Sequence, residues 1–280
     1  MYARPTGFAL LVVVTAAASV AARPIPRPPQ AADETAVATT APSLSEAEIA
    51  RLTTALDTSL AAPRDPADWP GAAKTAVWTF VERLQAAQLT PAQEAETLRH
   101  LDEIGRAHPA LIGVISQACQ TVRTQTVGKT APEITGRDLD GIEFKLSDYR
   151  GKVVVLAFTG DWCGICRSEY PYERFLVDLY RNWPFAILGV NSDADRALAH
   201  QASVRNGLTY RSWFDGPPGG PIASSWSVVG WPTVYVIDAR GVIRFVDLQR
   251  EDLLKGVREL LIETTRAGAG ATGPARTSER

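Results

Sequence analysis

The chain has 280 residues, of which 45% are hydrophobic and 21% are charged, so it has enough material for one large hydrophobic core or for two smaller ones. Its 29 basic and 31 acidic residues are interspersed and give a formal net charge of -2, which argues against recruitment of nucleic acid or of an anionic membrane surface by a long-range field. Three cysteines are too few for a scaffold stapled by disulfides, and two of them stand close together, which directs attention to reactivity.

The first 22 residues have the layout of a secretory signal peptide. A short segment with Arg4 precedes an apolar run at residues 8–14, and small residues follow up to Ala22, where cleavage is expected. With its alanines the run spans about 15 residues, fewer than the roughly 20 that cross a bilayer. We therefore expect a periplasmic or otherwise extracytoplasmic protein, attached to a membrane at most through an uncleaved N-terminal segment.

Residues 23–42 are rich in proline and have no hydrophobic period, which predicts an extended linker.

Residues 43–126 carry apolar side chains at helical spacing. The pattern predicts helices over residues 45–60, 71–88 and 90–105 and from residue 109 onward. Ser45 and Glu48 have the spacing of a capping box, and Thr90 with Gln93 repeats it ahead of the third helix. Four short helices in sequence predict a small, antiparallel, all-α domain.

From residue 127 onward the pattern changes to an alternation of strands and helices, with a hinge expected at residues 127–130. The predicted strands are 153–158, 185–191, 233–237 and 242–246, and the predicted helices include 163–181 and 193–206. The first of these strands is continuously apolar, as in a sheet buried on both faces, and the second is also expected to be buried. This order predicts an α/β domain over residues 127–266, followed by a disordered tail over residues 267–280.

Cys163 and Cys166 are separated by two residues at the predicted start of a helix that follows a strand. In the first turn of a helix, unpaired backbone N–H groups and the positive end of the helix dipole stabilise a thiolate. Because the thiolate is the nucleophilic form of cysteine, this position predicts a reactive pair. Trp162 directly precedes the pair and is expected to shield one side of it and to offer a flat surface to a partner. The alternative for Trp162 is an aromatic residue of the core.

The run from Asp161 to Pro171 (DWCGICRSEYP), with Trp231, Pro232 and Thr233 further along, resembles the thioredoxin-fold proteins of the TlpA/ResA-like periplasmic branch. The similarity covers residues 127–266 and leaves the helical prefix outside. It implies a thioredoxin-like sheet flanked by helices, preceded here by the small all-α helical domain.

The resemblance also implies roles for individual residues. Cys163 would attack a disulfide, Cys166 would resolve the resulting mixed disulfide, and the Trp231–Pro232 bond would be cis and lie against the sulfurs. A cis peptide bond is inexpensive only before proline, and the backbone of Trp231 would pair with an extended substrate segment. The alternative for Pro232 is a trans bond at the start of an edge strand. Trp162, Trp231 and Pro232 are thus predicted to bind the substrate.

The family further implies a buried acid that moves protons to and from the resolving thiol. Ordinary thioredoxins place an aspartate six residues before the first cysteine, where this chain has Ala157, whereas the TlpA/ResA-like branch places a glutamate three residues after the second, where this chain has Glu169. One helical turn brings Glu169 to the face of Cys166, so we predict a catalytic carboxyl with a raised pKa. A solvated first-turn glutamate is the alternative, and Asp161 is a weaker candidate.

The other reactive residues are interpreted as structural. Cys119 lies among apolar residues of the fourth predicted helix and is expected to pack as a small hydrophobic side chain. The three histidines have no metal-ligand spacing, and one cysteine pair falls short of the four ligands of structural zinc, so we expect neither a metal nor a cofactor. Arg167 stands where haem attachment requires histidine, and Gly160 replaces the threonine that precedes the reactive cysteine of peroxiredoxins.

These residues together predict an extracytoplasmic thiol-disulfide oxidoreductase. It would reduce disulfides of client proteins through Cys163 and Cys166, and an upstream redox partner would reduce it in turn. The alternative is that the helical domain over residues 43–126 is a protein-interaction or assembly module, with the thioredoxin-like domain as its redox switch. A thioredoxin-like domain without turnover is a third interpretation, which the intact cysteine pair disfavours.

Overall fold

The computed structural model describes residues 43–62 and 68–271, with side chains described up to residue 266. The predicted signal peptide over residues 1–22 and the predicted linker over residues 23–42 lie outside this part of the chain. Within the described part, no helix is both long enough and apolar enough to cross a membrane.

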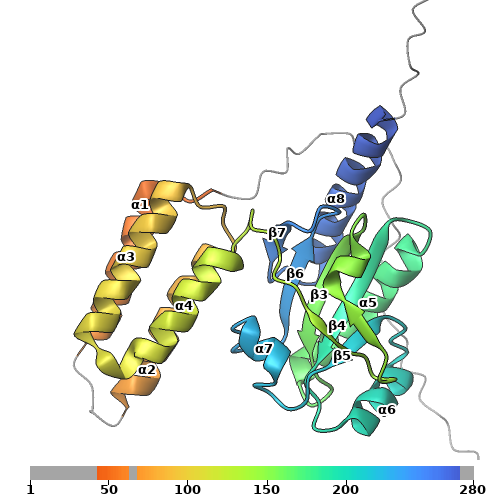
Figure 1. The fold of residues 1–280 in the computed structure, drawn as a ribbon, viewed down its shortest axis with the longest axis horizontal. Helices are drawn as coiled ribbons and strands as arrows, with labels where there is room; N and C mark the ends of the chain where they lie inside the picture. Colours follow the sequence, from red (N-terminus) through yellow and green to blue (C-terminus); the bar gives the residue numbers. More distant parts are fainter. Residues whose placement is uncertain (1–42, 63–67, 272–280) are drawn as a thin grey trace, which may run out of the picture. The chain divides into compact units, whose positions relative to one another are not determined.

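Four α-helices form the N-terminal part of the described chain, as the apolar spacing predicts (Figure 1). They are α1 (Glu46–Ala61), α2 (Trp69–Gln85), α3 (Pro91–Ala107) and α4 (Ile112–Thr124), with the short 3-10 helix η1 (Pro109–Leu111) ahead of α4. Both predicted capping boxes are present, Ser45 with Glu48 and Thr90 with Gln93. They satisfy backbone N–H groups that have no partner inside the first turns of α1 and α3.

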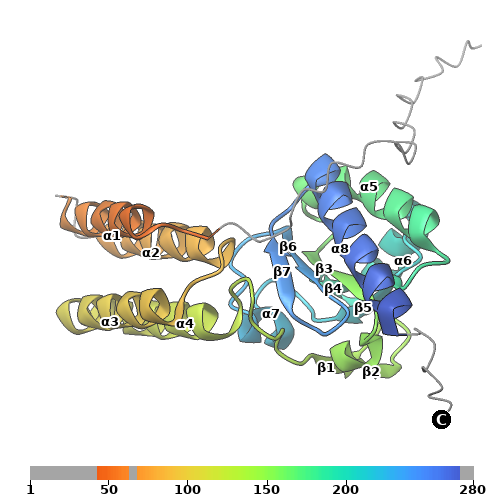
Figure 2. The ribbon, with the colours of Figure 1, turned by 90° about the horizontal axis from the view of Figure 1, so that it is seen from above.

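The four helices bury a common apolar core. α2 packs on α1 and on α4, and α4 packs on α3, so that α1 and α2 form one pair and α3 and α4 another (Figure 2). Leu84, Leu101 and Val122 come from three of these helices and are fully buried. Each such side chain contributes about 2 kcal/mol on burial. Cys119 lies in the same cluster as a small apolar side chain, which confirms its predicted packing.

A five-stranded mixed sheet forms the second part of the described chain. Its strands are β3 (Val153–Thr159), β4 (Phe185–Asn191), β5 (Arg211–Phe214), β6 (Thr233–Ile237) and β7 (Ile243–Val246). Their order across the sheet is β5-β4-β3-β6-β7, with β3, β4 and β5 parallel and β6 antiparallel to both of its neighbours (Figure 2). β1 (Thr135–Arg137) and β2 (Glu143–Lys145) form a separate two-stranded hairpin. The predicted thioredoxin-like sheet with flanking helices is confirmed.

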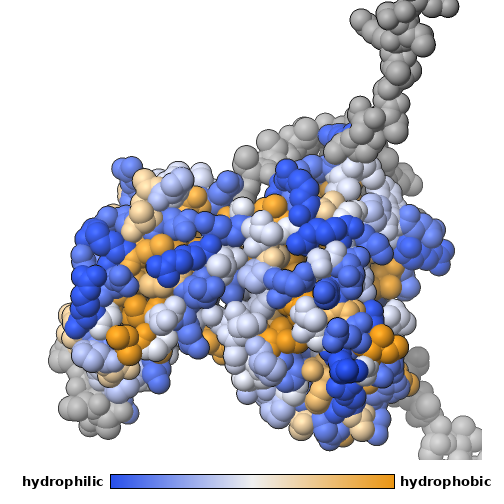
Figure 3. Space-filling model, viewed as in Figure 1, coloured by the Kyte–Doolittle hydropathy of each residue, from blue (hydrophilic) through white to orange (hydrophobic). Residues whose placement is uncertain are grey.

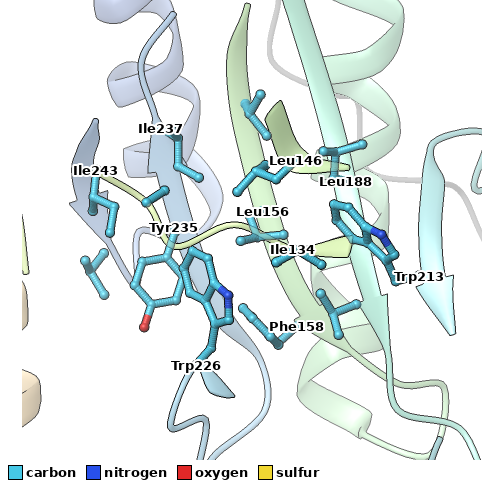
Figure 4. Close-up of a cluster of buried hydrophobic side chains, with 14 of the residues drawn as sticks. Ile134, Leu146, Leu156, Phe158, Leu188, Trp213, Trp226, Tyr235, Ile237 and Ile243 are labelled. Carbon is cyan, nitrogen blue, oxygen red and sulfur yellow. The ribbon is translucent and has the colours of Figure 1, made fainter. Parts of the chain in front are cut away.

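The central strand β3 is buried along its whole length because both faces of the sheet are covered. On one face, Val155 and Ala157 pack with α5 (Gly164–Tyr180) and α8 (Arg250–Ala271). On the other face, Leu156, Phe158 and Trp226 belong to a cluster that also takes in residues of β2 and of α7 (Pro221–Ser225) (Figure 4). This two-residue alternation is the side-chain period of a strand, and burial of both sides explains the continuously apolar run in the sequence.

Several boundaries differ from those predicted. α6 (Arg196–Asn206) begins later than residue 193 because Asp195 is its N-cap and accepts the backbone N–H of Leu198. The tail predicted from residue 267 is helical as far as Ala271, since α8 continues that far, and the alanines in this stretch favour the helix. The face of the molecule seen in Figure 3 carries mostly hydrophilic side chains, with hydrophobic areas on both the helical and the sheet part.

Candidate active site

Cys163 is the N-cap residue of α5. Strand β3 ends at Thr159, a short turn follows, and Cys163 has extended backbone angles while Gly164 opens the helix. The Cys163 sulfur accepts the backbone N–H of Cys166 at 3.2 Å, so it occupies the position that a capping oxygen takes at other helix starts. A thiolate at this position faces the positive end of the helix dipole.

The two sulfurs of the pair differ in access, and burial makes Cys166 a weaker acid than an ordinary cysteine. Cys163 is 7% exposed and Cys166 is 1% exposed, and both are free thiols. Burial, assisted by the neighbouring Cys163 sulfur, raises the pKa of Cys166 to about 12, and the Gly160 backbone and the Thr159 hydroxyl oppose this shift only in part. Cys166 is therefore protonated at neutral pH and needs a proton acceptor before it can attack another sulfur.

The loop ahead of β6 lies against Cys163. The Trp231–Pro232 peptide bond is cis, as the resemblance implies, and the alternative of a trans bond is wrong. The carbonyl oxygen of Trp231 accepts a hydrogen bond from the Cys163 thiol at 3.5 Å. Pro232 directly precedes Thr233, the first residue of β6. Residues that are far apart in the sequence thus meet at one reactive sulfur.

Two tryptophans beside Cys163 donate hydrogen bonds to the same residue, Ser192. Trp162 is 51% exposed and packs edge-on against Trp231, with ring centroids 5.8 Å apart. The indole N–H of Trp162 donates to the backbone oxygen of Ser192 at 2.9 Å, and that of Trp231 donates to the Ser192 hydroxyl at 3.0 Å. The exposure of Trp162 contradicts the alternative of a core aromatic. The sequence analysis missed Ser192, since a single serine after a strand carries no local signal.

Glu169 lies one helical turn beyond Cys166 and is only 4% exposed. Its Oε2 accepts the backbone N–H of Arg250 at 3.2 Å, and its Oε1 accepts the Nε–H of the same residue at 3.4 Å. This burial contradicts the alternative of a solvated glutamate in the first turn. The positive charge of Arg250, at the start of α8, compensates the buried carboxylate. The part of Glu169 in proton transfer stays a prediction.

Asp161, the weaker candidate for the acid, is engaged by another helix. Its carboxylate accepts hydrogen bonds from Arg205 at 2.6 Å and from Asn206 at 2.9 Å, both at the C-terminal end of α6. These contacts fasten the turn between β3 and α5 to α6. Asp161 therefore supports the site as an anchor of its loop.

A second buried carboxyl on α5 was missed by the sequence analysis. Glu173 is 4% exposed, and its Oε2 accepts the phenol O–H of Tyr210 at 2.6 Å. Burial raises the pKa of Glu173 to about 7; the Tyr210 hydrogen bond opposes the shift and the charge of Glu169 adds to it. A signal was available in the sequence, because Glu173 stands two helical turns after Cys166 on the same helical face.

The remaining cysteine and the histidines lie outside this site. Burial in the four-helix core raises the pKa of the Cys119 thiol. His100 pairs with Asp57 at 2.9 Å, and the ring of His108 packs against Trp69. Over residues 43–62 and 68–271, no group of three or more potential His, Cys, Asp or Glu ligands is placed to hold a metal ion.

Known proteins are similar to the part of the chain that contains the sheet. Residues 127–246 match the AhpC/TSA family. The thiol-disulfide oxidoreductase ResA of Geobacillus kaustophilus is 35% identical over 130 residues, which cover 45% of this chain and 74% of the relative. The protein of the same name from Bacillus cereus strain ATCC 10987 is 29% identical over 139 residues, which cover 50% of this chain and 79% of the relative.

Two solved structures are each similar to about half of the chain. The thioredoxin domain of a thiol-disulfide oxidoreductase from Bacteroides vulgatus is 27% identical, with a TM-score of 0.45, over 49% of this chain and 98% of that chain. A secreted thiol-disulfide isomerase from Corynebacterium glutamicum is 29% identical, with a TM-score of 0.43, over 48% of this chain and 84% of that chain.

Fold, dithiol and relatives agree on one class of protein, the thiol-disulfide oxidoreductases that are built on a thioredoxin-like domain. Within this class, the chain belongs to the ResA family, because 35% identity extends over 74% of the Geobacillus relative. The assignment concerns the sheet-containing part, since the four helices precede the residues that match the AhpC/TSA family.

Proposed function

We propose that the protein reduces disulfide bonds of client proteins outside the cytoplasm through the dithiol of Cys163 and Cys166. The observation that supports this proposal best is the sulfur of Cys163. It caps α5, accepts the Cys166 N–H at 3.2 Å and belongs to the more exposed cysteine of the pair. A sulfur in this position is stabilised as a thiolate and is the one that a partner reaches first.

The proposed reaction has two steps. The Cys163 thiolate attacks one sulfur of a client disulfide, and the other client sulfur leaves as a thiolate that takes up a proton. Cys166 then loses its proton and attacks the Cys163 sulfur, which forms the Cys163–Cys166 disulfide and releases the second client sulfur as a thiolate. Two electrons pass from the dithiol to the client, and an upstream redox partner returns them.

Trp162, Trp231 and Pro232 are proposed to bind the client segment. The half-exposed ring of Trp162 offers an aromatic surface directly beside the attacking sulfur. The Trp231 backbone lies next to the same sulfur, where an extended client segment could form main-chain hydrogen bonds. Glu169 is proposed to assist proton transfer at Cys166, because it is buried one helical turn away.

An extracytoplasmic location is proposed from the layout of residues 1–22, with their basic start, apolar run and small residues. Disulfide-bonded clients are abundant in such oxidising compartments and rare in the cytosol. The reductive direction then requires an electron supply, which is the reason for the upstream partner.

The proposal is tested by equilibrating the purified protein with glutathione couples and by following its reduction of insulin. We expect a reduction potential below about -200 mV, in the range of cellular reductants, and turnover that disappears in Cys163→Ser. A potential near about -120 mV, typical of a disulfide-forming oxidant, would overturn the direction. Turnover that survives in Cys163→Ser would overturn the assignment of the nucleophile.

A second candidate function is favoured by a groove in the four-helix part. α1 and α2 line an open groove with a volume of about 430 Å³, and most of its lining side chains are apolar, such as Leu52, Leu56 and Phe80. In this alternative the helices are an interaction or assembly module, and the thioredoxin-like domain is its redox switch. Removing residues 43–123 would abolish a biological interaction under this alternative, whereas it would leave reduction of small disulfides intact under the first proposal.

A further inference from the structure

The buried carboxylate of Glu169 accepts hydrogen bonds from one residue of another helix. The backbone N–H of Arg250 donates to its Oε2 at 3.2 Å, and the Nε–H of Arg250 donates to its Oε1 at 3.4 Å. Each carboxylate oxygen thus has its own donor, and both donors belong to the first residue of α8. The Glu169 side chain is 5% exposed, so these bonds take the place of water. The orientation of the carboxylate therefore depends on where the chain places Arg250.

The backbone at Arg250 has a conformation that arginine rarely adopts. Its φ is +50°, in the left-handed region that favours glycine. Asp247, three residues earlier, has a φ of +57°. Residues other than glycine persist in this region only where the surrounding structure holds them. The short segment from Asp247 to Arg250, which connects β7 with α8, is therefore held in one conformation by its contacts.

Two contacts hold this connecting segment. Asp247 exchanges two hydrogen bonds with Val234 of β6, because its backbone N–H donates to the Val234 carbonyl at 2.7 Å and its Oδ1 accepts the Val234 N–H at 3.1 Å. The side chain of Leu248 lies against Gly256 of α8, where an added Cβ atom would stand 2.8 Å from the Leu248 Cδ1. The segment is thereby fixed to the sheet and to α8, which gives Arg250 a defined position.

Charged and titratable groups from two helices surround Glu169. On α5 they are Cys166, one turn before it, and Glu173, whose carboxyl interacts electrostatically with that of Glu169. At the start of α8 they are Arg250 and the exposed Glu251. The strands β3 and β6 contribute apolar side chains to the cluster beneath α5. The Arg250 guanidinium is therefore placed to balance a carboxylate in a poorly solvated site, and the ionised carboxylate is the form that accepts a proton.

We propose that Arg250 positions the Glu169 carboxylate and keeps it ionised, ready to take up the proton of Cys166. The inference rests on the proposed function and deepens it. During resolution the Cys166 sulfur forms a bond to the Cys163 sulfur, and the bond from Cys163 to the client sulfur breaks with its electron pair on the client. The Cys166 proton passes to the Glu169 carboxylate, and from there to the departing client thiolate or to water. Arg250 acts on this reaction through Glu169 and is a positioning residue.

The test follows the reaction of the reduced full-length protein with one equivalent of dithiobis(nitrobenzoic acid) in a stopped-flow instrument. Attack by Cys163 releases a first coloured thiolate, and resolution by Cys166 releases a second. The second phase of the wild-type protein should accelerate with rising pH as Glu169 ionises. In Arg250→Gln this rise should move up by about one pH unit, because the carboxylate loses its cationic partner, and the phase should slow about tenfold on the acidic side of the rise. The first phase should not change.

The position of Arg250 allows variants that separate charge from backbone. Its side chain is 55% exposed, so its replacement leaves no buried cavity, and the backbone N–H is kept in each variant. Arg250→Lys retains the positive charge and should return the rise toward its wild-type pH. Arg250→Gly favours the positive φ, which offsets the loss of the ion pair in the folded state, and should show the same shift as Arg250→Gln. Arg258→Gln, an exposed arginine about two turns further along α8, is the matched control and should change neither phase.

A double-mutant cycle shows whether Arg250 acts through Glu169. Once Glu169→Gln is present, Arg250→Gln should have no further effect on the second phase. Equal slowing by Arg250→Gln in both backgrounds would overturn the inference.

Two other results would also overturn it while leaving the proposed function intact. One is a wild-type pH dependence of the second phase in Arg250→Gln. The other is an equal slowing of both phases without a shift in pH, which would make the role of Arg250 purely structural. A first phase that persists in Cys163→Ser would instead overturn the proposed function itself.

Discussion

At the residue scale, the site divides its chemistry between one accessible sulfur and one enclosed sulfur. Replacing Cys166 removes the resolving thiol and leaves Cys163 able to attack. We expect Cys166→Ser to accumulate mixed disulfides with client proteins, visible as reducible adducts by mass spectrometry. Cys119→Ser is the matched control, because Cys119 is also a buried free thiol, and it should trap nothing. A Cys166→Ser protein that turns over clients without adducts would contradict the resolving role.

Glu173 also couples the stability of the fold to pH. Its pKa is about 7 in the folded protein against an ordinary value of 4.5, so the folded state binds more protons than the unfolded state between these values. The contribution of Glu173 to the free energy of unfolding is therefore full below about pH 4.5, falls as the pH rises, and is lost above about pH 7. The loss amounts to about 3 kcal/mol.

Urea unfolding of the wild-type protein and of Glu173→Gln at pH 5 and pH 8 measures this coupling. The wild-type protein should lose stability relative to Glu173→Gln on going to the higher pH, since only the wild type must ionise a buried carboxyl. Equal changes in the two proteins would show that Glu173 does not titrate near neutrality.

At the element scale, the end of β4 fixes the surface beside the reactive sulfur, because Ser192 accepts both indole N–H groups. Ser192→Ala removes the bond to Trp231 and leaves the bond from Trp162 to the backbone. A hydrogen bond of this kind contributes about 1 kcal/mol, so we expect KM for a protein client to rise about fivefold, with kcat and the reduction of a small disulfide unchanged. Ser224→Ala in α7 is the control. An equal loss of kcat/KM with the protein client and with the small disulfide would show that the substitution affects the reacting sulfurs and not client binding.

Elements with a strong local pattern could be predicted from the sequence, and those that depend on distant neighbours could not. β4 was predicted with its observed bounds because its run is apolar as far as Val190, and the place of Cys163 at the start of a helix followed from a strand, a turn and a helix in order. β5 has only four residues, two of them half-buried, which is too short for a periodic signal. The ion pair of Glu169 with Arg250 joins residues 81 positions apart, and no local pattern encodes such a pair.

At the scale of the whole molecule, no described residue belongs both to the four-helix core and to a core of the sheet. Leu101 is fully buried in the four-helix core, and Leu101→Ala should cost about 2–5 kcal/mol of stability there. Below its unfolding temperature, Leu101→Ala should reduce small disulfides at the wild-type rate. Leu156→Ala in the sheet should lower both the stability and the rate of small-disulfide reduction. Loss of reduction in a still-folded Leu101→Ala protein would contradict this independence and would favour the redox-switch alternative.

The raised pKa of two of the three thiols makes the native protein easy to label at a single atom. Burial raises the pKa of Cys119 and of Cys166, so both are uncharged at neutral pH and unreactive toward iodoacetamide-type probes. A fluorophore offered to the folded chain will attach at Cys163, with the other two cysteines left in place. Such a fluorophore lies at the entrance of the site. A change in its emission intensity will report the binding of a macromolecule there.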